Sequence, residues 1–175
     1  MMKYISLIVL VLTVAARGAD TIHVGGAVSQ PADWTVDQLR TQFAADLKAV
    51  TYTSKDGTSH TSNCVPLMDI LKSAGVPMPA KSGAEPDARH KNPFLHFAVA
   101  VQGRDGYMVL FSLAELMPEF GNKDAWVALD EDGSALSGRD EPVKLIVPSD
   151  VKAGRWVRGV SAISVMDDGP PATQP

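Results

Sequence analysis

The sequence predicts an α+β domain built on a mixed or antiparallel β-sheet with a few short helices. Segments with strand character outnumber segments with helical periodicity, and the helical segments are short. No long alternation of strands and helices runs along the chain, as a doubly wound parallel sheet would require. The length of 175 residues suits a single domain with its own hydrophobic core.

The first elements expected along the chain are a strand, a short helix and a hairpin. Residues 21–28 carry an apolar strand pattern. Thr35 and Gln38 have the spacing of a capping box, in which each side chain bonds the backbone of the other, so a short helix is expected to begin there. Residues 46–61 alternate apolar and polar side chains around an Asp-Gly pair at 56–57, which predicts a hairpin with its turn at that pair.

A longer helix is predicted over residues 65–76, with Pro66 in its first turn and Gly75 as its C-cap. The residues that follow, 77–93, are polar and rich in Pro and Gly, which predicts a long surface loop. The apolar side chains of the helix share one face, made by Leu67, Ile70, Leu71 and Ala74.

The middle of the chain predicts a second hairpin and a third helix. Residues 94–112 form two apolar runs across an Asp-Gly turn at 105–106. Ser112 and Glu115 have capping-box spacing, and Gly121 is expected to end the short helix that they begin.

Strands are also predicted near the C-terminus. Residues 125–136 and 142–148 are expected to form two of them, joined by a turn at 132–133. A loop over 149–155 then leads to the last strand, residues 156–165.

The N-terminus has the pattern of a secretory signal. Lys3 precedes an apolar run at 5–12, and small residues follow it, so residues 1–18 are expected to be a signal peptide. The folded domain is then expected over 20–167, with a disordered tail at 168–175. We therefore expect a soluble periplasmic or secreted protein without a membrane segment after cleavage.

Charge and cysteine content narrow the class of protein. Removal of the signal takes away Lys3 and Arg17, leaving 16 − 2 = 14 basic against 20 acidic residues, a formal charge of 14 − 20 = −6. Such a chain is not expected to bind nucleic acid or anionic membranes. With Cys64 as its only cysteine, it cannot form an internal disulfide.

Four segments, taken in order, resemble the oxidoreductase molybdopterin-binding domain, the fold of the sulfite oxidase family, in a short stand-alone exported form. The resemblance covers roughly residues 22–166. It implies a sulfite oxidase molybdopterin-domain-like α+β fold. The four segments are CVPLMDILKSAGV at 64–76, DGYMVLFSLAEL at 105–116, AWVALDEDGSALSGRDEPVKLIVP at 125–148 and AGRWVRGVSAISV at 153–165.

In catalytic members, the resemblance implies, a cysteine thiolate about fifteen residues before a Gly-Val-Pro-Leu element binds molybdenum. The matching segment here, residues 44–53, has no cysteine, and Cys64 takes the place of the glycine. The family's His-Gly pair is replaced by Arg139-Asp140. The cofactor that the resemblance implies is molybdopterin. Because the expected cysteine and the His-Gly pair are both absent from their usual places, we expect no bound cofactor.

A basic cluster near the last strand is the candidate ligand site. Arg158 stands where the family has a lysine that contacts the cofactor. Together with Lys144, Arg158 and the other basic residues of this cluster could form an anion site for a phosphate or a pterin. The alternative is a solvated edge whose charges prevent pairing with another chain. The candidate cofactor-binding residues are Arg158, Arg155, Lys152 and Arg139.

The sequence assigns no metal ligand and no catalytic residue. Cys64 is expected to be a small, partly buried residue in a turn before a helix, because neither a second thiol nor a basic residue other than His60 lies near it to lower its pKa. His60 and Cys64 are not expected to form a metal site, since the residues between them are turn-like and no second ligand pair has zinc-site spacing.

These observations favour a binding or accessory module without a molybdenum thiolate, whose partner is an anionic small molecule or another protein. One alternative is a molybdenum-pterin oxidoreductase acting on a small substrate. The other is an interaction module whose former cofactor cleft is filled by side chains.

Overall fold

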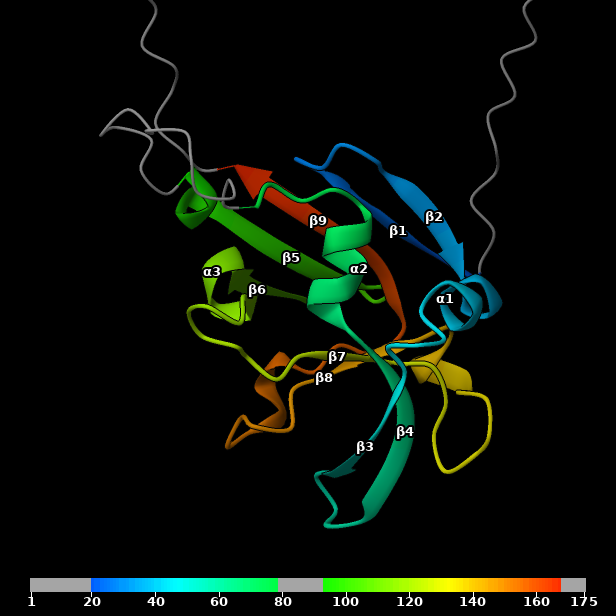
Figure 1. Ribbon diagram of the computed structural model, residues 1–175. Coiled ribbons are helices and arrows are strands. Elements are labelled where there is room, and N and C mark those ends of the chain that lie inside the picture. The colour runs from blue at the N-terminus through cyan, green and yellow to red at the C-terminus, as the bar shows by residue number, and fades with distance from the viewer. Residues whose placement is uncertain (1–19, 79–92, 168–175) are drawn as a thin grey trace, which may run out of the picture.

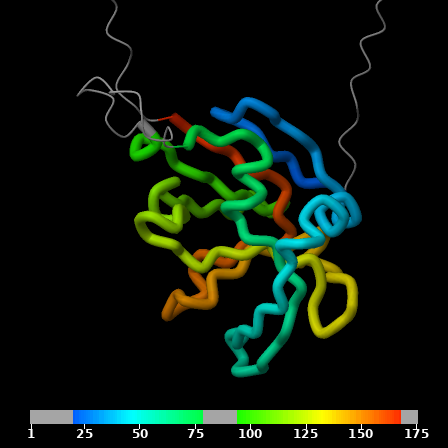
Figure 2. Tube along the Cα trace, in the orientation of Figure 1, coloured from blue at the N-terminus to red at the C-terminus, as the bar shows by residue number. Residues whose placement is uncertain are grey.

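A computed structural model describes residues 20–78 and 93–167 as nine strands in two sheets, with short helices packed around them (Figures 1 and 2). The expected signal peptide, the C-terminal tail and most of the expected surface loop lie outside the described residues. The larger sheet has the order β2-β1-β9-β5-β6 and the smaller one β3-β4-β7-β8. In the larger sheet β1 and β9 are parallel and the other pairs antiparallel, so the predicted mixed α+β class is confirmed.

The strands of the larger sheet are β1 (Thr21–Gly26), β2 (Ala32–Thr35), β5 (Phe97–Gly103), β6 (Met108–Ser112) and β9 (Val160–Asp167). Those of the smaller sheet are β3 (Lys48–Thr53), β4 (Ser59–Pro66), β7 (Trp126–Ala128) and β8 (Lys144–Ile146). The helices are α1 (Val36–Gln42), α2 (Leu67–Ser73) and α3 (Leu113–Leu116), with 3-10 turns η2 (Pro93–His96), η3 (Gly138–Asp140) and η4 (Ala153–Arg155).

The core lies between one face of the larger sheet and the helices. Val99 of β5 and Ile163 of β9 are fully buried in one cluster with Leu67 and Ile70 of α2. Alternate residues of each strand enter this cluster because successive side chains point to opposite faces. No helix among residues 20–78 and 93–167 is long and apolar enough to cross a membrane.

The capping box predicted for the first helix is confirmed. The backbone N–H of Gln38 donates to Thr35 Oγ1 at 3.2 Å, and the N–H of Thr35 donates to Gln38 Oε1 at 2.8 Å. The strand β2, which pairs with β1 directly before this helix, is not predicted from the sequence. A strand of four residues at a sheet edge leaves almost no periodic pattern to read.

The first hairpin is confirmed, but the turn predicted at Cys64 and the helical start predicted at Pro66 are wrong. β3 and β4 are antiparallel, and the left-handed Gly57 (φ 88°) makes the turn. β4 continues through Pro66, because residues 64–66 also pair with β7. Cys64 is therefore a strand residue, and the helix begins only at Leu67.

The second hairpin is confirmed, and the helix after it is shorter than predicted. β5 begins at Phe97, because a 3-10 turn occupies the four residues before it. Ser112 is the last residue of β6, paired with Ala98, and makes no side-chain cap. The capping box predicted there is wrong, and the helix ends at Leu116 instead of Gly121.

The turn predicted at 132–133 is present but does not join two long strands. Asp132 (φ 51°) and Gly133 (φ 79°) close a single bridge between Glu131 and Ser134. β7 ends before this turn, and the 3-10 turn η3 lies between the turn and β8. The last strand begins at Val160, later than predicted, because η4 and a short irregular segment come first.

Candidate functional site

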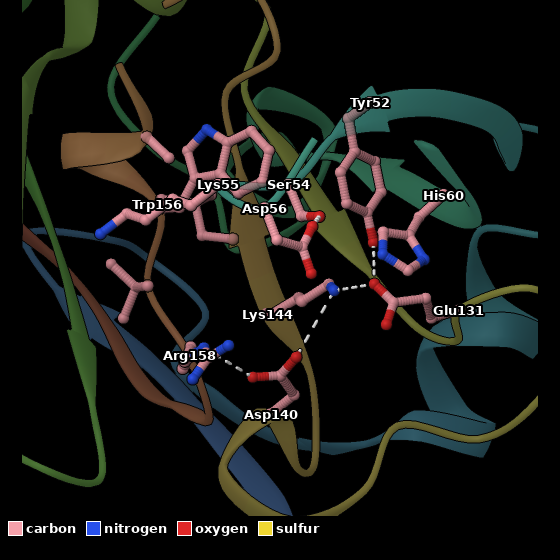
Figure 3. A pocket seen from close by; sticks show the side chains of 13 residues that line it. Tyr52, Ser54, Lys55, Asp56, His60, Glu131, Asp140, Lys144, Trp156 and Arg158 are labelled. Atoms are coloured by element: carbon pink, nitrogen blue, oxygen red, sulfur yellow. Dashed lines mark hydrogen bonds and ion pairs between the residues drawn. The ribbon is translucent and has the colours of Figure 1, made fainter. Parts of the chain in front are cut away.

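A pocket of about 480 Å³ opens beside the smaller sheet (Figure 3). Its walls come from the β3–β4 hairpin, from β8 and from the segment that joins η4 to β9. The lining residues are Tyr52, Ser54, Lys55, Asp56, His60, Glu131, Asp140, Lys144, Leu145, Ala153, Trp156, Val157 and Arg158.

Glu131 links two side chains at one side of the pocket. Its Oε2 accepts hydrogen bonds from the Tyr52 hydroxyl and from Lys144 Nζ. The Tyr52 hydroxyl also lies 3.1 Å from Ser62 Oγ, and Lys144 Nζ lies 5.0 Å from the centre of the Tyr52 ring. Burial and the bond to Glu131 raise the pKa of Tyr52, so the phenol is a proton donor here.

The network continues from Lys144 to Arg158. Lys144 Nζ is 3.5 Å from Asp140 Oδ2, and Arg158 Nε is 3.1 Å from Asp140 Oδ1, as the dashed lines in Figure 3 show. Burial opposes the charge of Lys144, but the bonds from Glu131 and Tyr52 outweigh it and raise the pKa of the ammonium group. Burial would raise the pKa of Glu131, and the bonds from Lys144 and Tyr52 lower it instead.

This network neutralises most of its own charge. Two cations, Lys144 and Arg158, face two carboxylates, Glu131 and Asp140. The more exposed side of the pocket adds Lys55 and Asp56, again of opposite sign. An incoming ligand therefore meets a polar pocket without a large net charge.

Aromatic rings form an apolar wall. The ring of Trp156 meets the ring of Tyr52 edge to face, with centroids 5.3 Å apart, a favourable arrangement for aromatic pairs. Its indole N–H donates to the carbonyl of Val147 at 3.1 Å, which fixes the orientation of the ring. The pocket thus combines an apolar wall with charged groups opposite, as small-molecule sites usually do.

His60 ties the hairpin to the turn at 132–133. Its Nδ1 lies 2.7 Å from Asp132 Oδ2, and the backbone N–H of Thr61 donates to Asp132 Oδ1 at 2.9 Å. The bond from Asp132 raises the pKa of His60. This contact positions the hairpin residues that line the pocket.

Of the four predicted ligand-binding residues, Arg158 lines the pocket. Arg155 instead makes a two-pronged ion pair with Asp150, with both bonds at 2.8 Å, and a third contact with Glu115 at 2.8 Å. Its guanidinium also lies 4.8 Å from the ring of Phe111. These contacts hold η4 against α3 and β6 and engage the donors of Arg155.

The other two predicted residues also lie outside the lining of the pocket. Lys152 is exposed directly before η4. The side chain of Arg139 is 75% exposed and pairs with Asp105 at 3.4 Å. The structure therefore brings Arg158 together with Lys144 and leaves the other three predicted residues outside the lining of the pocket.

Cys64 is buried behind the pocket. Its side chain is 0% exposed and packs with Tyr52, Ala128 and Ile146. Burial is the main cause that raises the pKa of its thiol to about 12. The thiol is inaccessible and protonated at neutral pH, unlike a reactive or metal-binding cysteine.

Within residues 20–78 and 93–167, no group of three or more His, Cys, Asp or Glu side chains could hold a metal ion. The residues between His60 and Cys64 are strand rather than turn. A spacing of four positions along a strand sets their Cα atoms about 13 Å apart, too far to bind one ion.

Most of the pocket could not be predicted from the sequence. No local pattern in the sequence points to Tyr52 or Trp156 as site residues, Glu131 falls in a predicted strand, and Asp140 is noted only in the pair that replaces the family's His-Gly. These residues lie far apart in the sequence, and only the folded chain brings them together around one pocket. One signal was present: Tyr52 falls in residues 44–53, the segment where the resemblance places the metal-binding cysteine.

Comparison with known proteins supports the fold assignment. The model of the family described as "Oxidoreductase molybdopterin binding domain" matches residues 13–174. Among solved structures, a similar one is the sulfane dehydrogenase SoxCD from Paracoccus pantotrophus, with 18% sequence identity and a TM-score of 0.60. The match covers 86% of this chain and 39% of the SoxCD chain, so this chain spans about two fifths of that length. A search of curated proteins found no match.

Proposed function

The chain belongs to the family of oxidoreductase molybdopterin-binding domains, and from this premise we propose that it is a ligand-binding accessory module that works without a molybdenum–thiolate bond. The pocket between the β3–β4 hairpin, β8 and η4 is its binding site. The ligand is a small molecule with an anionic group.

One observation carries the proposal. In residues 44–53, where the family resemblance places the metal-binding thiolate, the residue that lines the pocket is Tyr52. Its phenol is already hydrogen-bonded to Glu131 and close to Ser62. A side chain held in this way contributes to the wall of the pocket and is not available to a metal.

The groups that line the pocket do not fit a molybdenum centre held by a protein thiolate. Such a bond needs an accessible and ionised thiol. Cys64 is the chain's only cysteine, it is 0% exposed, and the pKa of its thiol is about 12. The polar groups that line one side of the pocket are instead a phenol, an ammonium and carboxylates that bond one another.

The anionic group of the ligand is assigned to Arg158. Its side chain is 61% exposed, and its ion pair with Asp140 uses Nε. The terminal nitrogens of the guanidinium can therefore form the paired bonds that carboxylates and phosphates favour. Lys55 adds a second cation on the exposed side, and Trp156 offers an apolar surface for the rest of the ligand.

We also propose that the chain is exported. The support is the sequence of residues 1–18, in which a lysine, an apolar run and small residues follow in the order of a signal peptide. Mass spectrometry of the exported protein should give a new N-terminus between Ala15 and Asp20. A soluble exported product that retains Met1 would contradict this part of the proposal.

Calorimetric titration with 6-carboxypterin, a stable pterin with one carboxylate, tests the pocket. Arg158→Ala should weaken binding about tenfold, because a hydrogen bond to a charged group contributes about 1.5 kcal/mol at an exposed site. Arg139→Ala is the matched control, since that arginine lies outside the pocket lining. Equal binding by Arg158→Ala and the wild type would remove Arg158 from the site.

The same titration addresses the alternative of a filled cleft. A volume of about 480 Å³ is large enough for a small molecule and argues against that alternative. If the wild type bound neither 6-carboxypterin nor inorganic phosphate, a filled or closed cleft would be favoured and the present proposal would be wrong.

A further inference from the structure

One face of the larger sheet is turned away from the core. Val99, Val101, Ile163 and Val165 point inward and are buried, so their neighbours in β5 and β9 point outward. The register aligns these neighbours with alternate residues of β6. We call this surface the outer face, made by Ala98, Ala100, Gln102, Met108, Leu110, Ser112, Ala162, Ser164 and Met166.

The outer face carries no charged side chain. An antiparallel sheet with one solvated face normally alternates apolar residues toward the core with polar and charged residues toward water. Here Met108, Leu110 and Met166 are 52%, 51% and 37% exposed. Exposed apolar side chains gathered in this way mark an interaction surface.

The edge of the sheet has the same character. β6 is an edge strand with the sequence MVLFS, which has neither a charge nor a proline to discourage pairing. The opposite edge, β2, carries Asp33. The apolar surface is thus confined to the β6 side of the sheet.

The outer face has a ridge and a trough. Leu110 and Met108 project from β6 and form the ridge. In the same row as Leu110 stand Ala100 of β5 and Ser164 of β9, and Ala100 is only 5% exposed although it points outward. Small residues beside a row of large ones leave a shallow trough next to the ridge.

We propose that the outer face binds a second copy of this chain. A two-fold axis along β5 between two facing sheets would set the β6 ridge of each copy over the β9 trough of the other. Sheets pack face to face in this way at a spacing of about 10 Å. In such an interface the same patch is used twice, so a ridge and a trough in one patch are self-complementary.

Charge favours a second copy over another kind of partner. The chain is acidic, with a formal charge of −4, so two copies repel each other wherever their charged surfaces meet. A contact between two copies is therefore favoured on a surface without charge, and the outer face is one. A basic or acidic partner would instead be recognised by complementary charges, which the outer face lacks.

Sedimentation velocity over a range of concentrations tests this proposal. The mean mass of the wild type should rise from that of one chain toward that of two. Leu110→Glu on the ridge and Ser164→Lys in the trough should each keep the mass of one chain. Val151→Glu is the control, because Val151 is 101% exposed and lies outside the outer face, so this variant should associate like the wild type. Circular dichroism and thermal unfolding establish that each variant is folded.

Mixing the two charged variants gives a sharper test. Each mixed pair has one native contact of ridge and trough and one contact between the new carboxylate and the new ammonium group. Association should therefore return in the mixture. A wild type with the mass of one chain at all concentrations would overturn the proposal, as would association of Leu110→Glu alone or a mixture that stays monomeric.

Discussion

Lys144 holds the pocket network together, so its removal is the most informative single change. Its side chain is 10% exposed and pairs with Glu131 and with Asp140. In Lys144→Met the aliphatic stem is kept, and only the ammonium group is lost. Glu131 then keeps its bond to Tyr52, and Asp140 keeps its ion pair with Arg158.

The expected cost follows from the burial of the two carboxylates. Removal of one partner from a fully buried ion pair destabilises a protein by about 3–5 kcal/mol. The side chains of Glu131 and Asp140 are 27% and 18% exposed, so water can replace part of the lost interaction. We expect Lys144→Met to lower the free energy of unfolding by about 2–3 kcal/mol.

Urea unfolding monitored by tryptophan fluorescence measures this cost, with Lys152→Met as the matched control because Lys152 is exposed. The double variant Lys144→Met, Glu131→Gln should recover about 1 kcal/mol, since it no longer leaves a carboxylate without its cation. A cost below about 0.5 kcal/mol, in the range of an ordinary surface change, would refute the reasoning. Failure of the double variant to recover any stability would refute it as well.

The pH dependence gives an independent check on the same pair. The pKa of Glu131 is lowered from its ordinary value of 4.5. The stabilisation from this group is therefore present above pH 4.5 and is lost as the pH falls through the lowered folded-state pKa. The difference between the wild type and Lys144→Met should accordingly become smaller in acid.

Three further predictions concern other parts of the fold. Arg155 is the main group that lowers the pKa of Asp150 from 3.8 to about 2. Asp150→Asn should therefore lower the free energy of unfolding in urea by roughly 1–2 kcal/mol at neutral pH, and this loss should vanish as the pH falls through about 2. The hydrogen bond with Asp132 raises the pKa of His60. NMR titration should give His60 a pKa above 6.5 that returns toward 6.5 in Asp132→Asn, and an unchanged pKa in this variant would show that Asp132 does not act on His60. Cys64 is 0% exposed, so its thiol should react with a disulfide reagent only as fast as the protein unfolds. Cys64→Ser should lower the free energy of unfolding by about 1 kcal/mol. Rapid labelling of the native protein would show instead that the thiol is accessible.

Local signals in the sequence were enough to predict most of the elements. The capping box at Thr35 and the Asp-Gly turn at Gly57 depend on neighbouring residues, and both are present in the structure. The errors arose where distant strands decide the outcome. Cys64 and Pro66 became strand residues because β7 pairs with them, and β7 lies about sixty residues further along the chain.

The pocket was harder to predict for the same reason. Arg158 could be singled out because it falls in a recognisable segment. Tyr52 and Glu131 are separated by 79 positions in the chain, and only the pairing of β3, β4 and β7 brings them together. Arg155 shows the converse, because Asp150 and Glu115 engage it in a way that no local pattern revealed.

The molybdenum content of the protein purified from its native compartment tests the central proposal most directly. Elemental analysis should find far less than one molybdenum atom per chain, with the same result for Cys64→Ser, because the only thiol is buried behind the pocket. About one molybdenum atom per chain in the wild type, lost in Cys64→Ser, would contradict the account and establish Cys64 as a metal ligand.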